Sequence, residues 1–375
     1  MRVCVATIVR HPEDARIMHR QIRALLDAGH EITYVAPFTD CNVTPDPPIR
    51  AIDVPRAIGN HRGRALKAAR GALGRGVEGA DLLIVHDMEL LFRLPGRRPV
   101  TVWDVRAPRE NPPGAGDGAA WHPRRVMSAL VRRAEARAER DLRIVLSEES
   151  LGERFDGSHP VVPDAAYVPA GPPVPPGRNR VVHIGHLSES GGVNELIATA
   201  RGLLPHGIRL DLIGSADARV RPLLRDAQRQ GLLDWYGHVP NRHALRMAEG
   251  AIAGLSLPRA APGRRPLPSK VVDYMSRGVP VVTTPLPAAS ALVGRTGCGV
   301  VVPFGDAGAV VGAVLALRDD PAGTAEMGAR GHAEALAHHN WPDQAGQYIG
   351  MLEEWAGKTV TSRLEIGVLE AWHVI

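Results

Sequence analysis

The stretch RRPLPSKVVDYMSRGVPVVTT (residues 264–284) predicts a short helix that leads directly into a buried strand. Pro268-Ser269-Lys270 has the composition of a helix start, where Ser269 can cap free backbone N–H groups, and Gly278 is a typical helix end. The apolar run VPVVTT (279–284) then has the composition of a strand. A helix followed by a strand in this way is one unit of an α/β fold.

The same stretch gathers positive charge before the helix. Arg264, Arg265 and Lys270 flank its first turn, where free N–H groups favour an anion such as a diphosphate. The carboxylate of Asp273, one turn further, could accept hydrogen bonds from ribose hydroxyls. The alternative interpretation is a solvated basic loop in front of an ordinary helix.

The first half of the chain alternates short apolar runs with helical stretches. Such alternation predicts right-handed βαβ crossovers and a parallel sheet that is covered on both faces. One helical stretch runs from about Asp14 to Ala28, and Gly29 ends it. The predicted strands are VCVATIV (3–9), EITYVAP (31–37), IRAIDVP (49–55), DLLIVHD (81–87), VTVWDV (100–105) and LRIVLSE (142–148).

The alternation breaks at VPDAAYVPAGPPVPPGRNR (162–180), which is rich in proline and glycine and reads as a linker. It then resumes, which predicts two doubly wound α/β domains in series with a cleft between them. We expect an N-terminal domain over 1–165, a linker over 166–180, a second domain over 181–345 and a C-terminal helix or tail over 346–375. The later predicted strands are VVHIGH (181–186), IRLDLIG (208–214), LDWYGHV (233–239), AIAGLSLP (251–258), VPVVTT (279–284) and GVVVPF (299–304).

Composition narrows the class of protein. The 375 residues carry a net charge of +5, and the basic side chains are nearly all arginine, a pattern typical of GC-rich bacterial genomes. This modest excess fits an anionic small molecule, whereas aromatic side chains do not interleave with a basic patch as in nucleic-acid-binding proteins. Cys4, Cys41 and Cys298 are far apart, so we expect buried thiols in a reducing cytoplasm. No apolar run approaches the length of a membrane span.

A resemblance to a known family follows from these stretches together. Asp273-Tyr274-Met275, Gly278 and the strand after it resemble the nucleotide-sugar motif of the GT-B glycosyltransferases of family 4. The resemblance spans nearly the whole chain and implies that the C-terminal helix or tail packs back on the N-terminal domain. The other similar stretches are HPEDARI (11–17), LLIVHDMELL (82–91), VVHIGHLSESGGVNELIATA (181–200), LDLIG (210–214) and WYGHVP (235–240).

The resemblance implies a metal-independent, hexosyltransferase-like enzyme that transfers a sugar from a nucleotide diphosphate sugar to an acceptor, with retention at the anomeric carbon. It implies no cofactor, and the sequence has no Asp-x-Asp pair to chelate a metal. The base would lie near Gly237 to Val239. The residues implied for the donor's diphosphate and nucleotide are Gly185, His186, Gly214, Val239, Arg264, Arg265, Ser269, Lys270 and Asp273.

On the acceptor side, the resemblance points to Asp14, Arg16, His86 and Arg106 as catalytic residues. The first three have a plainer interpretation. Asp14 and Arg16 could pair with each other at a helix start, and His86 could cap the helix that follows its strand. Asp104, at the end of another strand, could be a functional carboxylate or a helix cap.

The chain departs from the family pattern at several positions. Arg265 stands where the motif usually has its first glutamate, and His186 and Gly191 stand where the glycine loop usually offers basic residues. Arg106 replaces the histidine that lies at the reacting sugar. Two interpretations remain: the phosphate-binding charges have moved to Arg264, Arg265 and Lys270, or the chain is a degenerate relative that acts as an accessory or partner protein.

One further surface bears on partners. The predicted helix over 122–143 carries six arginines between positions 124 and 140. Such a face can bind an anionic membrane, although a solvated face with internal ion pairs is the more common outcome. The sequence leaves the acceptor, the sugar, the base and the oligomeric state open.

Overall fold

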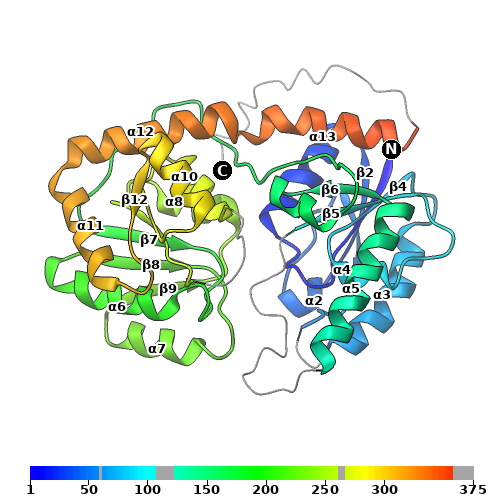
Figure 1. Cartoon of the computed structure of the whole chain (residues 1–375), viewed down its shortest axis with the longest axis horizontal. Coiled ribbons are helices and arrows are strands. Elements are labelled where there is room, and N and C mark those ends of the chain that lie inside the picture. The colour runs from blue at the N-terminus through cyan, green and yellow to red at the C-terminus, as the bar shows by residue number, and fades with distance from the viewer. Residues whose placement is uncertain (59–60, 107–121, 261–266, 358–375) are drawn as a thin grey trace. The chain divides into compact units, whose positions relative to one another are not determined.

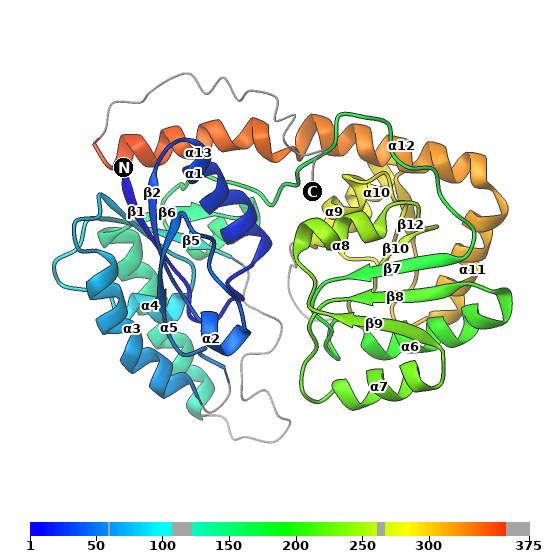
Figure 2. The same cartoon turned by 180° about the vertical axis from the view of Figure 1, so that it is seen from behind.

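The computed structural model describes residues 1–58, 61–106, 122–260 and 267–357; of residues 122–130 it describes the backbone alone. The chain divides into two compact units (Figures 1 and 2). Of the described residues, those within Met1–Pro163 and from Pro342 onward form unit 1, and those within Asp164–Trp341 form unit 2. Each unit contains its own six-stranded parallel sheet with helices packed against it, which confirms the prediction of two Rossmann-like domains.

The sheet of unit 1 has the strand order β3-β2-β1-β4-β5-β6, and all of its pairs are parallel. The four residues of β4 are buried, as expected for a central strand of a covered parallel sheet. The strands are β1 (Arg2–Ala6), β2 (Glu31–Ala36), β3 (Ile49–Asp53), β4 (Leu82–Val85), β5 (Val100–Val105) and β6 (Arg143–Leu146).

The first helix of unit 1 is unusual. Its opening turns form a π-helix, η1 (Ala15–Ile22), which continues into α1 (Arg23–Asp27). Asp14 caps it by accepting hydrogen bonds from the backbone N–H groups of Arg16 and Ile17. π-Helical turns are rare and occur often at functional sites.

The remaining helices of unit 1 lie along both faces of its sheet (Figure 2). Small residues on the buried side of α3 let it approach the sheet closely, because a Cβ atom at Gly76 would lie 2.8 Å from the sulfur of Cys4. Burial raises the pKa of that thiol to about 12. The helices are α2 (Phe38–Cys41), α3 (Arg62–Gly76), α4 (Met88–Leu91), α5 (His122–Asp141), the 3-10 helix η3 (Glu149–Arg154) and α13 (Trp341–Trp355).

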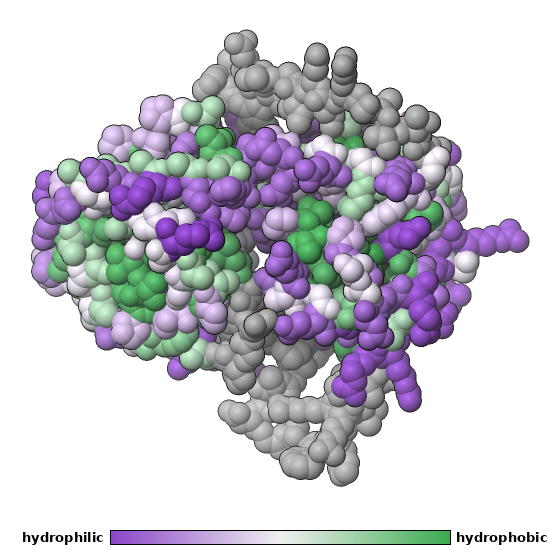
Figure 3. Space-filling view, turned by 45° about the horizontal axis from the view of Figure 1, so that its top comes forward, coloured by the Kyte–Doolittle hydropathy of each residue, from purple (hydrophilic) through white to green (hydrophobic). Residues whose placement is uncertain are grey.

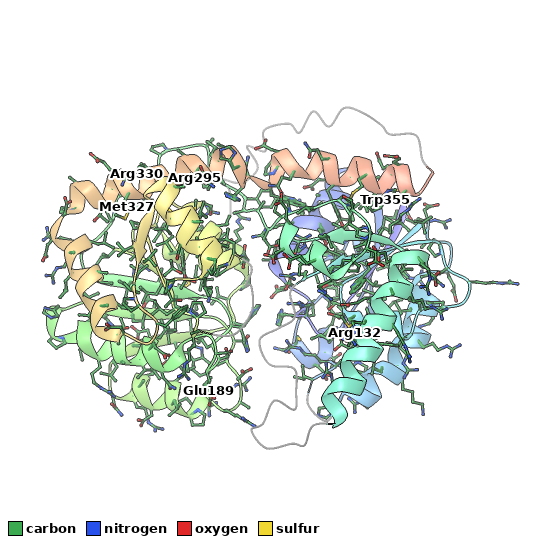
Figure 4. All side chains as sticks on the ribbon, in the orientation of Figure 1. Arg132, Glu189, Arg295, Met327, Arg330 and Trp355 are labelled. Atoms are coloured by element: carbon green, nitrogen blue, oxygen red, sulfur yellow. The ribbon has the colours of Figure 1, made fainter. Side chains whose placement is uncertain are left out.

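Helix α13 returns to unit 1 from the end of the chain. The side chain of Tyr348 is 1% exposed, and Glu353 lies 3.3 Å from the ring of His30. At the end of the helix, the guanidinium of Arg143 lies 5.9 Å from the ring centroid of Trp355, which is labelled in Figure 4. Helix α13 is therefore part of the core of unit 1.

The sheet of unit 2 has the strand order β12-β11-β10-β7-β8-β9 and is also parallel. Its strands are β7 (Arg180–Ile184), β8 (Arg209–Ile213), β9 (Leu233–Gly237), β10 (Gly254–Ser256), β11 (Val281–Thr283) and β12 (Gly299–Val301). Its helices are α6 (Val193–Leu203), the 3-10 helix η4 (Leu204–His206), α7 (Arg221–Arg229), α8 (Asn241–Ala248), α9 (Ser269–Met275), α10 (Pro287–Thr296), α11 (Ala307–Asp319) and α12 (Pro321–His338).

The expected cap of α9 is wrong in one respect. The helix begins at Ser269, and Pro268 occupies the capping position without a side-chain hydrogen bond. Proline has no N–H group and a fixed φ, so it can precede a helix without leaving a donor unpaired. Gly278 follows the helix with φ of +62°, and a Cβ atom there would lie 2.2 Å from that of Pro173.

The proline-rich segment packs along unit 2. The N–H of Ala166 donates to the carbonyl of His339, and the N–H of Gly177 donates to that of Gly250. Pro173 covers Gly278 in the same way. The residues from Asp164 to Asn179 therefore form an extended segment that packs on unit 2 and is part of it.

Among the described residues, no helix combines the length and the hydrophobicity that crossing a membrane requires. Hydrophilic side chains project from the surface of unit 1 in Figure 3. Of the three cysteines, Cys4 and Cys298 are buried as expected, and Cys41 is half-buried.

Candidate functional site

Each sheet has one place where neighbouring strands send their chains to opposite sides. In unit 1 this switch point lies between β1 and β4, and in unit 2 it lies between β7 and β10. Open α/β sheets bind ligands in the crevice beyond the carboxyl ends of the strands at such points. The candidate site residues gather at these two places.

In unit 2, the side chain of Tyr274 holds β7 and β10 apart. The two strands pair at Val182 and Gly254. One rung further, Ile184 N–H donates to the hydroxyl of Tyr274 (2.8 Å), which in turn donates to the carbonyl of Leu255 (3.2 Å). Burial raises the pKa of Tyr274, so its hydroxyl keeps the proton that it donates. The hydroxyl thus replaces a direct strand-to-strand hydrogen bond and opens the sheet at the switch point.

Lys270 lies at this opening. Its ammonium is 3.3 Å from Nε2 of His183, and Nδ1 of the same ring is 3.0 Å from the carbonyl oxygen of Leu255. Burial, and then the charge of Lys270, hold the pKa of His183 well below its ordinary value. A Cβ atom at Gly185 would lie 3.3 Å from the nitrogen of Lys270. The cation is therefore held against the turn that follows β7.

Three loops approach one another so closely here that glycine is required. Gly185 has φ of +129° and Gly214 has φ of +153°, and a Cβ atom at Gly214 would lie 1.8 Å from the carbonyl oxygen of Gly185. A Cβ atom at Gly192 would lie 1.9 Å from the carbonyl oxygen of Leu257. These close approaches leave backbone exposed to a ligand without intervening side chains.

The other predicted donor-binding residues of unit 2 have different surroundings. Both ring nitrogens of His186 are engaged, Nδ1 with the hydroxyl of Ser215 (3.0 Å) and Nε2 with the carboxylate of Asp217 (2.8 Å). Val239 packs against the core, and Asp273 is 5% exposed on α9. Ser269 is the first residue of the same helix. Arg264 and Arg265 lie outside the described residues.

In unit 1, a buried ion pair lies beneath the carboxyl ends of the strands. The guanidinium of Arg16 donates to both carboxylate oxygens of Asp104, each at 3.1 Å, and the amide of Gln21 donates to the same carboxylate. Burial alone would raise the pKa of Asp104, but Arg16, His86 and these hydrogen bonds hold it below its ordinary value. Asp104 is therefore a buried anion and not a helix cap.

His86 lies beside this pair at the end of β4. Its Nδ1 is 3.7 Å from an oxygen of Asp104, and among the described residues neither ring nitrogen makes a hydrogen bond. Burial lowers its pKa to about 4. The ring is therefore neutral at pH 7.

Asp14 and Arg106 meet above the buried pair. The guanidinium of Arg106 lies 2.9 Å from Asp14, and the two side chains are 16% and 17% exposed. Burial opposes ionisation of Asp14, but Arg106 and Arg10 hold its pKa well below the ordinary value. The expected pairing of Asp14 with Arg16 is thus only a backbone cap, because the carboxylate pairs with Arg106 instead.

The structure brings all four acceptor-side candidates to the carboxyl edge of one sheet. Asp87 secures that edge, because its carboxylate accepts hydrogen bonds from Thr7, Ile8 and Val9 after β1. Sequence reasoning did not single out Gln21 or His183. The one signal for His183 is a polar residue within the apolar run VVHIG (181–185).

The comparisons with known proteins agree with this architecture. Residues 178–320 match a protein-family model described as Glycosyl transferases group 1. No curated protein matches the chain.

Solved structures match nearly the whole chain at low identity. A sucrose-phosphate synthase from Thermosynechococcus elongatus is 16% identical with a TM-score of 0.71, over 94% of this chain and 98% of that one. Anabaena HepE in complex with UDP and glucose is 15% identical with a TM-score of 0.66, over 94% and 99%. WaaG, a glycosyltransferase involved in lipopolysaccharide biosynthesis, is 12% identical with a TM-score of 0.63, over 93% and 99%.

The matched family segment covers the Gly185 turn, Lys270 and Asp273, so it contains the whole described site of unit 2. Residues 178–320 thus match the model of the group 1 glycosyltransferases, and the chain as a whole has the GT-B fold.

Proposed function

We propose that this protein transfers a hexosyl group from a nucleotide diphosphate sugar to an acceptor, with retention at the anomeric carbon and without a metal ion. The family match over unit 2 supports the donor class, and so does HepE, a protein of similar fold whose structures contain UDP and glucose. A single observation carries the proposal furthest: the ammonium of Lys270 is fixed at the Gly185 turn, at the switch point of the unit 2 sheet.

The chemistry explains why a cation is needed there. When the bond between the sugar and the diphosphate breaks, negative charge accumulates on the departing phosphate oxygens. An ammonium held in place before the reaction stabilises that charge without having to reorganise. In this proposal Lys270 supplies the charge that a metal supplies in other enzymes, and the backbone around Gly185 and Gly214 lets the phosphates come close.

The remaining roles follow from position. We assign Asp273 to the ribose hydroxyls and the segment from Gly237 to Val239 to the base. In unit 1 we assign the edge that carries Asp14 and Arg106 to the acceptor, with His86 beneath it. Arg16 is 1% exposed and bound to Asp104, so its role is to fix that edge.

The test is product detection by mass spectrometry over a panel of UDP-, GDP-, ADP- and dTDP-sugars, with calorimetric titration of the free nucleotides. We expect transfer with one donor, and we expect the Lys270→Ala variant to lose about ten- to a hundredfold in kcat/KM. Lys67→Ala, at an exposed position on α3, is the matched control and should leave kcat/KM unchanged. Activity that EDTA abolishes would contradict the metal-independent reaction.

No product with any donor, together with no nucleotide binding at millimolar concentration, would refute the enzyme proposal and favour an accessory protein. Transfer that Lys270→Ala leaves unchanged would refute the role of this cation and leave the reaction itself standing.

A further inference from the structure

We propose that His183 is a positioning residue that fixes the ammonium of Lys270 against the Gly185 turn. This inference rests on the proposed function, which assigns the donor's diphosphate to Lys270. His183 does not touch the substrate in this proposal. It acts through the lysine.

The hydrogen-bond partners of the ring define its tautomer. Nδ1 is 3.0 Å from the carbonyl oxygen of Leu255, and a carbonyl can only accept, so Nδ1 must carry the proton. Nε2 of a neutral ring then bears a lone pair. Lys270 has donors only, and its ammonium is 3.3 Å from Nε2. Lys270 therefore donates to Nε2 of His183, and Nδ1 of His183 donates to the carbonyl of Leu255, so each donor meets an acceptor.

The residues that anchor these hydrogen bonds are held within the sheet of unit 2. His183 is fully buried within β7, and Leu255 lies in the neighbouring strand β10. The carbonyl of Leu255 accepts hydrogen bonds from both His183 and Tyr274, at the point where the two strands separate. The opening of the sheet and the position of the lysine thus depend on the same backbone group.

A lysine needs such an anchor more than most residues. Its side chain has four rotatable bonds, and ordering it on ligand binding costs free energy. An apolar residue at position 183 would fill the same space but would remove the Nε2 acceptor that the ammonium contacts. Each binding event would then have to order Lys270, which is expected to weaken nucleotide affinity about two- to tenfold.

The experiment compares UDP affinity, or that of whichever nucleoside diphosphate binds, in five proteins by calorimetry. These are the wild type, His183→Leu, His183→Gln, Lys270→Ala and the double variant His183→Leu with Lys270→Ala. Glutamine retains an acceptor oxygen at the reach of Nε2, so His183→Gln should recover part of the affinity that His183→Leu loses. The double variant should bind no more weakly than Lys270→Ala, because His183 acts only through the lysine.

His332→Leu is the matched control. This histidine of unit 2 is also buried and donates to a backbone carbonyl, that of Pro169 (2.8 Å), so its loss should lower thermal stability and leave affinity unchanged. Additive losses in the double variant, or wild-type affinity in His183→Leu, would overturn the positioning role. If Lys270→Ala binds as the wild type does, the proposed function of the lysine fails first, and this inference fails with it.

Discussion

Replacing Tyr274 with phenylalanine should destabilise unit 2 by about 2–3 kcal/mol. The hydroxyl accepts from Ile184 N–H at 2.8 Å and donates to the carbonyl of Leu255 at 3.2 Å, and all three groups are buried. Without it, the N–H of Ile184 has no partner, and an unsatisfied buried donor costs about 1–3 kcal/mol. The carbonyl of Leu255 loses less, because His183 still donates to it. No cavity larger than one oxygen atom forms, so packing contributes little.

The assay is urea denaturation of wild type and Tyr274→Phe, followed by intrinsic fluorescence and circular dichroism. Tyr236→Phe is the matched control, since that side chain is 49% exposed and its only hydrogen bond among the described residues is a long one to Asp211 (3.4 Å). It should fall within about 0.5 kcal/mol of the wild type. A Tyr274→Phe protein as stable as this control would refute the bridging role of the hydroxyl.

Three further predictions concern buried or crowded groups. Arg16→Met should lower the free energy of unfolding by about 3–5 kcal/mol, because it leaves Asp104 as an unpaired buried charge. Adding Asp104→Leu should recover much of this loss, as measured by thermal unfolding. The pKa of His86 is lowered to about 4 in the folded protein, so the unfolded chain takes up a proton at this residue first as the pH falls below about 6.5. Through this residue, the free energy of unfolding of the wild type should fall by about 2 kcal/mol between pH 7 and pH 5. His86→Gln should not show this part of the loss when its unfolding is measured at both pH values. Gly214→Ala should prevent normal folding or lower the free energy of unfolding by more than about 3 kcal/mol, because its Cβ atom would lie 1.8 Å from a carbonyl oxygen. The control Gly207→Ala, whose Cβ atom would have nothing within 4 Å, should lower it by about 1 kcal/mol. Equal thermal stabilities for the two variants would contradict the crowding at Gly214.

The fold was predictable because each strand is an apolar run bounded by residues that favour turns and helix ends, such as glycine. Gly29, Gly185, Gly214 and Gly278 all have positive φ, as expected for residues that end a helix or turn the chain after a strand. The cap of α9 was not predictable with the same rules, since both Pro268 and Ser269 suit a helix start and the sequence does not rank them. The π-helical turns after Asp14 have no sequence signal of their own.

The candidate site was predictable in its location but not in its pairings. Residues at strand ends meet at one edge of a parallel sheet, so His86 and Arg106 could be placed there from the order of the chain. Which carboxylate takes which cation depends on three-dimensional packing: Arg16 pairs with Asp104, 88 residues away, and not with Asp14. Lys270 and His183 are likewise 87 residues apart, and no local pattern joins them.

The position of α13 in unit 1 has a consequence for the order in which the two units complete their folding during synthesis. Synthesis proceeds from the N-terminus, so all of unit 2 leaves the ribosome before α13 does. Until then, Tyr348 does not cover Arg16 and Asp104, and the ion pair that is buried in the finished protein is open to solvent. Unit 1, although its first strand is synthesised at the outset, is therefore the last part of the molecule to reach its final packing.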